Sequence, residues 1–498
     1  NLLEQSTVDP YYLSQPIISA LRHHPDFSQI LELTGSGKLE IGIAYGDVAE
    51  QLSAIPLLLQ VMGLGPINSL EIERMLTLLR RAMIVETVAG KTDDKGLPFS
   101  AALALQCFAN EYVFRETDEE KTAVEHLQQQ IAALVEKGRD VPRSCVATLG
   151  AYRPLYSFPW AQELCEREWA SDIMEVVKLQ ISEPQNEQSL RSSIPSPTSI
   201  RDTVSQSVRE QYEENPYPRW IKTGMGSNGR SIGAVLRGAP LRFDLGDYDS
   251  PESPKILVAG CGTGRHVLAT ASRFSNAHVL AVDLSLSSLS YALRKTKELE
   301  ISNIEYAQWD IMKLGSLGRQ FDLIECGGVL HHLGDPLAGW RVLVDLLQPG
   351  GLMKIGLYSE IARQVIIRGR SLIAEKGYTT SPKDIRRCRQ DIIAMAEDGN
   401  QEMTKLCNNK DFFSLSGCRD LLFHVQEHRF TLLQIGAALQ AFKLKFLGFE
   451  LQDRRALKNF TKSHPSKSAL TSLNLWHEFE LENPDTFQGM FQFWCKKN

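Results

Sequence analysis

The chain has 498 residues, 43% hydrophobic and 23% charged, the balance of an ordinary globular protein with room for two or three domains. Its formal net charge of −6 argues against a nucleic-acid partner, since general nucleic-acid binders are usually basic. The nine cysteines are scattered and form no C-x-x-C pair, which indicates reduced thiols in a cytoplasmic protein rather than disulfides or a metal site.

The amino-terminal part of the chain has no feature of a targeting or membrane segment. The first residues, NLLEQSTVDPYY, lack the basic start and the apolar stretch of a signal peptide. The best apolar run, Ala54–Gly65, is shorter than the roughly 18 residues that cross a bilayer. We therefore expect no membrane partner.

Residues 1–182 are predicted to form an all-helical domain, because apolar residues recur at helical spacing and strand-like alternation is scarce. Thr117 with Glu120, and Asn68 with Glu71, form capping-box patterns at the start of two such segments. Further candidate helices are Tyr11–His23, Phe99–Phe114 and Pro159–Gln180.

A predicted linker and a predicted lid segment follow this domain. Residues 183–200, EPQNEQSLRSSIPSPTSI, are polar and carry three prolines, which predicts a linker. Residues 201–250 are predicted to form a lid, in which a helical pattern stops at the Asn215–Pro218 turn. We expect Tyr212 and Arg219 to close over a ligand of the next domain, with Arg219 near an anionic group. Aromatic packing of this segment is the alternative.

Residues 251–498 are predicted to form an α/β domain with a seven-stranded, mostly parallel sheet. The expected strands are Lys255–Ala259, Val279–Val282, Ile304–Gln308, Phe321–Glu325, Gly351–Leu357, Leu444–Leu451 and Met490–Cys495. Residues 359–410, after the fifth strand, are too long for a simple connection and are predicted as a helical insertion at the ligand-binding edge.

The segment Lys255–Asp283 reads as an apolar strand, a glycine-rich turn, a helix, a second apolar strand and a terminal aspartate. The glycines of the turn, Gly260, Gly262 and Gly264, let the backbone turn sharply and approach a ligand. Asp283 can accept hydrogen bonds from both hydroxyls of a ribose. A dinucleotide fingerprint would have a glycine at the position of Arg265, so the turn favours a different nucleoside cofactor.

The pattern G-C-G-T-G resembles motif I of class I S-adenosylmethionine-dependent methyltransferases. From Tyr212 onwards the chain is similar to bacterial members of this family that are often fused to tetratricopeptide repeats, although no repeats are visible here. The strings that carry this resemblance are YEENPYPRW, AGCGTG, LHHLGDPLAGWRVLVDLLQPGGLMKIGLYSE, SGCRDLLFHVQEHRFT and FLGFEL. It implies a Rossmann-like methyltransferase sheet and S-adenosyl-L-methionine as the cofactor.

The resemblance also implies roles for individual cofactor contacts. The three glycines would hold the methionine portion and Asp283 the ribose. Leu284 would be a further cofactor contact, and Tyr212 with Arg219 would close the site. Asp310 would accept from the adenine amino group, and the backbone N–H of Ile311 would meet the ring; a solvated turn is the alternative for Asp310. Glu325, at the end of the fourth strand, would face the methionine portion.

Two pairs of histidines are candidate catalytic residues. His331 and His332 follow the fourth strand, where an imidazole can act as a general base near neutral pH, or can only orient its neighbours. His424 and His428 lie in HVQEH, which also matches the H-x-x-E-H of inverted zinc peptidases. A sheet that binds a nucleoside leaves little room for a peptidase, so we expect no metal. We expect contact with a polar acceptor, or else buried histidines with satisfied hydrogen bonds.

These observations predict a methyltransferase that acts by direct displacement at the sulfonium methyl. The helical domain is large for shaping a small site, which favours a protein or peptide acceptor over the alternative, a small-molecule metabolite. Two other classes compete: an NAD-dependent oxidoreductase, against which Arg265 argues, and a non-catalytic scaffold, against which the glycine turn and Asp283 argue. The arginines of DIRRCRQD are expected on a solvated helix, with a docking site for an acidic segment as the alternative.

Overall fold

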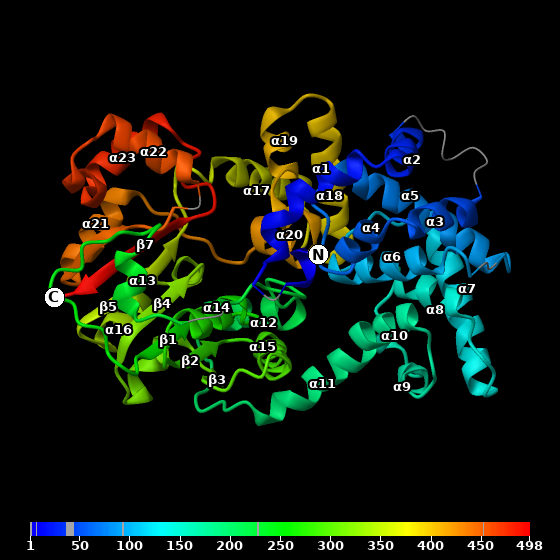
Figure 1. The fold of residues 1–498 in the computed structure, drawn as a ribbon, viewed down its shortest axis with the longest axis horizontal. Coiled ribbons are helices and arrows are strands. Elements are labelled where there is room, and N and C mark those ends of the chain that lie inside the picture. Colours follow the sequence, from blue (N-terminus) through cyan, green and yellow to red (C-terminus); the bar gives the residue numbers. More distant parts are fainter. Residues whose placement is uncertain (1, 6, 36–43, 92–93, 227–228, 452) are drawn as a thin grey trace. The chain divides into compact units, whose positions relative to one another are not determined.

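The computed structural model describes residues 2–5, 7–35, 44–91, 94–226, 229–451 and 453–498. The chain forms two compact units (Figure 1). The helical unit comprises Asn1–Ser189, Arg219–Thr223 and Ser371–Phe423, and the sheet unit comprises Leu190–Pro218, Gly224–Arg370 and His424–Asn498.

The helical unit has its own core around α6 (Leu97–Ala109), in which every residue except Pro98 is buried. Thr117 and Glu120 form the predicted capping box at the start of α7 (Asp118–Glu136). The box predicted at Asn68 and Glu71 is wrong by one residue, because Ser69 is the residue whose side chain accepts from the first turn of α5. The amino-terminal helices are α1 (Ser14–Arg22), α2 (Pro25–Gly35), α3 (Tyr45–Ser53), α4 (Pro56–Met62), α5 (Leu70–Val88), α8 (Arg143–Gly150), α9 (Ala161–Cys165) and α10 (Ser171–Val177).

The range 183–200, which its composition predicts as a linker, begins as a helix, α11 (Glu183–Leu190). Proline within a helix lacks an N–H and its ring meets the carbonyl four residues earlier. Here the turn before Pro184, Lys178–Ser182, is a π-helix, in which the N–H of Glu183 donates to Lys178. The wider turn accommodates the proline and lets the helix continue.

The insertion predicted at 359–410 divides between the units. Helix α17 (Gln364–Lys376) begins in the sheet unit and ends in the helical unit, which also holds α18 (Pro382–Glu397), α19 (Gln401–Cys407) and α20 (Leu415–Leu422). Arg389 of α18 is buried and donates two 2.9 Å hydrogen bonds to the carboxylate of Glu73 in α5. The arginine-rich helix is therefore not wholly solvated, since Arg389 forms an ion pair inside the helical unit.

The sheet unit contains the predicted seven-stranded α/β sheet of the Rossmann-like methyltransferase type, in the order β3-β2-β1-β4-β5-β7-β6 (Figure 1). Strands β1 to β5 are parallel, and β7 is antiparallel to both β5 and β6. The strands are β1 (Lys255–Ala259), β2 (His278–Asp283), β3 (Ile304–Gln308), β4 (Phe321–Gly327), β5 (Leu347–Leu357), β6 (Leu444–Phe449) and β7 (Phe491–Lys497).

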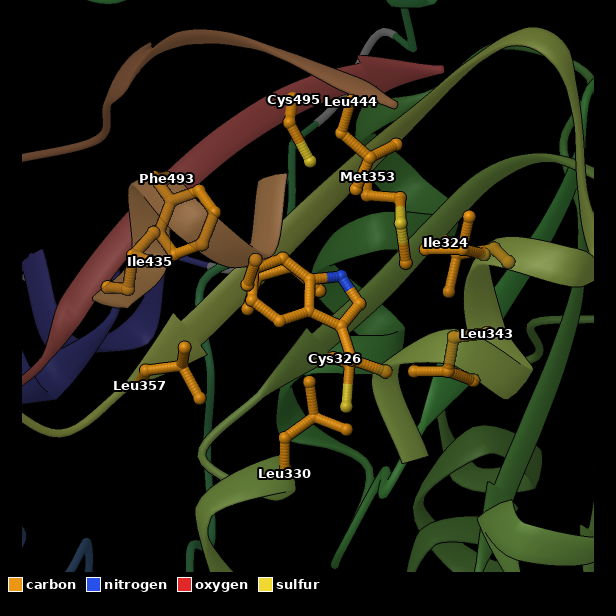
Figure 2. Packing of buried hydrophobic residues seen from close by; sticks show 14 of the residues in the cluster. Ile324, Cys326, Leu330, Leu343, Met353, Leu357, Ile435, Leu444, Phe493 and Cys495 are labelled. Carbon is orange, nitrogen blue, oxygen red and sulfur yellow. The ribbon is translucent and has the colours of Figure 1, made fainter. Parts of the chain in front are cut away.

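Helices cover both faces of this sheet. On one face, α16 (Pro336–Asp345), α21 (Leu432–Ala441) and α23 (Leu473–Glu482) contribute to a cluster of buried apolar side chains, part of which Figure 2 shows. Ile324, Met353 and Phe493 come from three strands of that cluster, and Leu343 from α16 (Figure 2). The other face carries α13 (Ile232–Arg237), α14 (Arg265–Arg273) and α15 (Leu286–Glu298).

Two further helices, α12 (Thr203–Glu214) and α22 (Arg454–Ser463), complete the sheet unit. The described parts of both units contain no helix with the length and apolar character that a bilayer crossing requires.

Candidate functional site

The turn after β1 requires its glycines. Gly260, Gly262 and Gly264 have φ angles of 74°, 52° and 85°, in the left-handed region that side chains disfavour. A Cβ on Gly264 would lie 2.6 Å from the Cβ of Ala292, and one on Gly262 would lie 2.7 Å from the carbonyl oxygen of Tyr217. The turn is therefore packed closely against α15 and the lid segment, and a side chain at either position would displace its neighbours.

Asp283 ties this turn to the end of β2. One carboxylate oxygen accepts from the N–H of Gly262 at 2.8 Å and the other from the N–H of Ser285 at 3.0 Å. Burial raises the pKa of Asp283 above its usual value, although these backbone hydrogen bonds oppose the shift. The next residue, Leu284, accepts a 2.8 Å hydrogen bond from the Gln308 amide through its carbonyl.

Asp310 and Ile311 lie beside Asp283 in the sheet, directly after β3. The backbone N–H of Trp309 donates to the carbonyl of Asp283 at 2.9 Å, which joins the two strand ends. Asp310 is buried, and its carboxylate accepts from the N–H of Met312 at 2.9 Å, so it caps the 3-10 helix Ile311–Leu317. Contact of Asp310 and Ile311 with an adenine stays a prediction.

Glu325, near the end of β4, is buried against α14. Its carboxylate lies 3.0 Å from Nε2 of His266 and accepts from the hydroxyl of Thr270. Burial opposes ionisation of this carboxyl, but His266, Lys354 and the Thr270 hydroxyl outweigh it and lower the pKa of Glu325 to about 2. These described contacts are with the protein itself, and the predicted contact of Glu325 with the methionine portion stays a prediction.

The end of α12 packs onto the start of α15. The hydroxyl of Ser285 donates to the carbonyl of Tyr212 at 3.0 Å, and that of Ser287 donates to Glu213 at 2.7 Å. Glu213 also accepts from the backbone N–H of Leu286. Sequence reasoning missed Glu213, although a carboxylate suits the positive end of a helix.

Arg219, the other residue predicted to close the lid, belongs to the helical unit. Its guanidinium carbon lies 4.1 Å from the ring centre of Phe108, which is also in that unit. The cation–π contact accounts for this placement, and a contact of Arg219 with the cofactor stays a prediction.

The structure brings the four predicted histidines together within the sheet unit. The ring centres of His331 and His332 are 4.3 Å apart, and His332 stacks on His424 at 3.6 Å with 17° between the planes. The backbone N–H of His428 donates to the carbonyl of His331 at 2.7 Å. Tyr212 joins this histidine cluster, because its hydroxyl lies 3.2 Å from Nε2 of His424.

Hydrogen bonds assign the tautomers of two rings. Nδ1 of His332 lies 2.7 Å from the carbonyl oxygen of Gln426, so Nδ1 carries the proton and Nε2 keeps a lone pair. Nδ1 of His424 accepts from the N–H of Gln426 at 3.2 Å, which places its proton on Nε2, facing Tyr212. Burial lowers the pKa of His332 to about 4 despite the Gln426 carbonyl, and it also lowers the pKa of His331 and of His424 well below the ordinary value. All three rings are therefore neutral at pH 7.

An aromatic and ionic layer that the sequence analysis missed supports the cluster. Tyr358, directly after β5, stacks on His331 with ring centres 3.8 Å apart. The guanidinium of Arg363 lies 3.7 Å from the Tyr358 ring centre and forms an ion pair with the buried Glu427. The position of Tyr358 at a strand end is the signal that could have pointed to it.

Comparison with known proteins supports methyltransferase activity. Residues 256–351, from β1 into β5, match the family model described as a methyltransferase domain. An uncharacterized protein of Synechococcus sp. is 28% identical over 293 residues, 56% of this chain and 68% of its own. The ubiquinone biosynthesis O-methyltransferase of Acinetobacter baylyi is 31% identical over 20% of this chain and 40% of its own. Phosphoethanolamine N-methyltransferase 1 of Arabidopsis thaliana is 29% identical over 25% of each chain.

Solved structures match parts of this chain. PKMT2 from Rickettsia typhi in complex with AdoHcy is 17% identical, with a TM-score of 0.40, over 50% of this chain and 49% of its own. An S-adenosylmethionine-dependent methyltransferase from Clostridium acetobutylicum is 27% identical, with a TM-score of 0.21, over 22% of this chain and 46% of its own. The chain thus spans about half the length of these structures, and the resemblance to repeat fusions stays a prediction.

Proposed function

We propose that this chain is an S-adenosylmethionine-dependent methyltransferase whose acceptor is a protein or peptide. The observation that carries the methyl-transfer part concerns two neighbouring strand ends. Three glycines with left-handed φ angles follow β1, and Asp283 ends the adjacent strand β2. The hydrogen bond from Gly262 to Asp283 joins these two features directly. The match of residues 256–351 to a methyltransferase domain supports the same assignment.

The residues at these strand ends fit the cofactor. Each oxygen of Asp283 accepts one backbone hydrogen bond, and a carboxylate offers about four lone-pair sites, so it can still accept from ribose hydroxyls. The positive N-terminal end of α14 suits the carboxylate of the methionine portion. When bound, the cofactor supplies an electrophilic methyl group on its sulfonium.

The histidine cluster would hold the acceptor. His332 follows β4 and Tyr358 follows β5, at the same edge of the sheet as the glycine turn. Tyr212 connects the two regions, since its carbonyl accepts from Ser285 and its hydroxyl meets His424. The chain would act mainly by holding the acceptor in line with the methyl–sulfur bond while excluding water. Nε2 of His332 can accept a hydrogen bond, or a proton, from the acceptor.

The size of the helical unit supports a protein or peptide acceptor. It combines Asn1–Ser189 with Ser371–Phe423 around a separate core, which is more structure than a small-molecule site needs. A small-molecule acceptor remains the second candidate, because relatives over the matched region are named for ubiquinone biosynthesis and for phosphoethanolamine.

Calorimetric titration with S-adenosylmethionine tests the cofactor assignment. Asp283→Ala removes the carboxylate that would bind the ribose and should weaken binding at least about tenfold, since hydrogen bonds to a charged group contribute about 1.5–3 kcal/mol. Asp322→Ala is the matched control, because Asp322 accepts a 2.8 Å hydrogen bond from the N–H of Lys255 at the start of β1. Equal affinities for both variants would remove the role assigned to Asp283.

The acceptor is tested by incubating the enzyme with radiolabelled methyl donor and a cell lysate, followed by fractionation. Label in the protein fraction is the expected result. Label confined to small molecules would replace the protein acceptor with the second candidate.

A further inference from the structure

Three arginines of the sheet unit lie around the histidine cluster, and two of them are paired with carboxylates. Arg363 pairs with the buried Glu427, and Nε of Arg429 lies 3.3 Å from Glu360, with Nη1 3.6 Å from Glu427. These two arginines are thus matched by two carboxylates. Arg370 is a third arginine in the same field, since Glu427, Arg363 and Arg429 all act on it electrostatically.

The two terminal nitrogens of the Arg370 guanidinium differ in their hydrogen bonding. Its Nη2 donates to the carbonyl of His424 at 2.9 Å, which places the guanidinium beside the histidine cluster. Within the described parts of the chain, Nη1 of Arg370 is buried and has no hydrogen-bond partner. A buried guanidinium N–H group without an acceptor is costly, so its retention calls for a ligand that supplies one.

No histidine nitrogen among the described residues accepts from Nη1 of Arg370. His424 directs its Nε2 proton to Tyr212, and Nδ1 of His332 donates to Gln426. The rings stay neutral because burial and the neighbouring arginines disfavour a further positive charge. Beside Nη1 of Arg370 itself, an ammonium group would be repelled and an anion attracted.

We propose that the histidine cluster binds an acceptor that carries a carboxylate, and that Nη1 of Arg370 holds this group. The inference rests on the proposed function, because it names the chemical class of the methyl acceptor. A carboxylate matches the planar donors of a guanidinium, from which it can accept two parallel hydrogen bonds. The carboxylate can belong to a peptide or to a small molecule.

Three probes of the same shape test the charge preference: benzoate, benzamide and benzylamine. Each is titrated by ligand-observed NMR into the full chain with S-adenosylhomocysteine present. We expect benzoate to bind at least about tenfold more tightly than either of the others, because only benzoate pairs with Arg370. Benzamide or benzylamine binding as tightly as benzoate would overturn the proposal.

Two variants of the same helix assign the effect to one residue. Arg370→Gln should weaken benzoate at least about tenfold, whereas Arg368→Gln, at an exposed position of α17, should leave it unchanged. Arg370→Lys keeps the charge and should restore part of the affinity, which loss of the His424 contact alone would not predict. Unchanged benzoate affinity in Arg370→Gln would overturn the proposal.

Failure of the carboxylate subsite can be distinguished from failure of the proposed methyltransferase function. Failure of S-adenosylmethionine to bind in calorimetry would remove the methyltransferase assignment, whatever the benzoate result. Binding of the cofactor without selective benzoate binding would remove only the carboxylate subsite. The peptide and small-molecule sources are distinguished by whether Arg370→Gln reduces label in the protein fraction or in the small-molecule fraction of the lysate.

Discussion

Glu480 of α23 makes stability depend on pH in an unusual direction. One oxygen of its carboxyl accepts from the hydroxyl of Ser359, and the other is buried without a partner among the described residues. Burial raises the pKa of Glu480 from its ordinary value of 4.5 to about 7, and the Ser359 hydroxyl only partly opposes this. At 1.36 kcal/mol for each pKa unit, the ionised carboxyl costs the folded state about 3 kcal/mol.

The sign follows from proton binding. Between pH 4.5 and 7 the folded chain keeps a proton on Glu480 that the unfolded chain has released. Stability therefore falls as pH rises through this window, and the loss is complete above pH 7. Glu480→Gln keeps an acceptor for Ser359 and cannot ionise, so it should raise the free energy of unfolding by about 3 kcal/mol at pH 8. The gain should vanish near pH 4.5.

Urea denaturation at pH 4.5, 6 and 8 measures this difference by tryptophan fluorescence, to which Trp476 in the same helix contributes. Glu482→Gln, at an exposed position two residues further on, is the matched control and should change stability little at any pH. A gain from Glu480→Gln that is equal at all three pH values would refute the ionisation argument. If Glu480→Gln lowered the free energy of unfolding at pH 8, another group would have to stabilise the ionised carboxylate.

Two other substitutions test the packing of each unit. Gly264→Ala should destabilise the sheet unit by more than about 1 kcal/mol and weaken S-adenosylmethionine binding, because the position has φ +85° and the new Cβ would meet Ala292. Thermal melts and calorimetry compare it with Gly315→Ala, where nothing lies within 4 Å. Arg389→Met should cost the helical unit about 3–5 kcal/mol in urea denaturation, because it leaves Glu73 buried and unpaired. Replacing Glu73 by Met as well should recover most of that loss, and no recovery would contradict the ion-pair explanation.

The sheet could be predicted from the sequence because its signals are local. Strands buried on both faces require continuous apolar runs, and β1 and β3 have the predicted bounds. Once the strand order is known, Asp283 must lie beside the glycine turn, since parallel neighbouring strands end at the same edge. This part of the candidate site follows from topology alone.

The division of the insertion between the units could not be predicted in this way. Arg389 reads as one of several arginines on a polar helix, and only its partner Glu73, 316 positions earlier, shows that it is buried. The helix at the start of the predicted linker was missed for a related reason, although the boundary between the two units does fall within 183–200. Polar composition and Pro184 gave no sign of a helix, but a π-turn, held where the buried Gln180 donates to Ala104 and Gly150, removes the clash that would end it.

In the histidine cluster, the position of each ring and its protonation state have different physical causes. The sequence places four histidines at one sheet edge, and a free histidine there would be a base near neutral pH. Burial, together with Arg363 and Arg370, instead lowers the pKa of His332 to about 4, which keeps its Nε2 lone pair available at pH 7 but makes it a weak base. A ring of this kind orients a hydrogen-bond donor better than it removes a proton. In the proposed methyl transfer we therefore expect this cluster to position the acceptor rather than to abstract a proton.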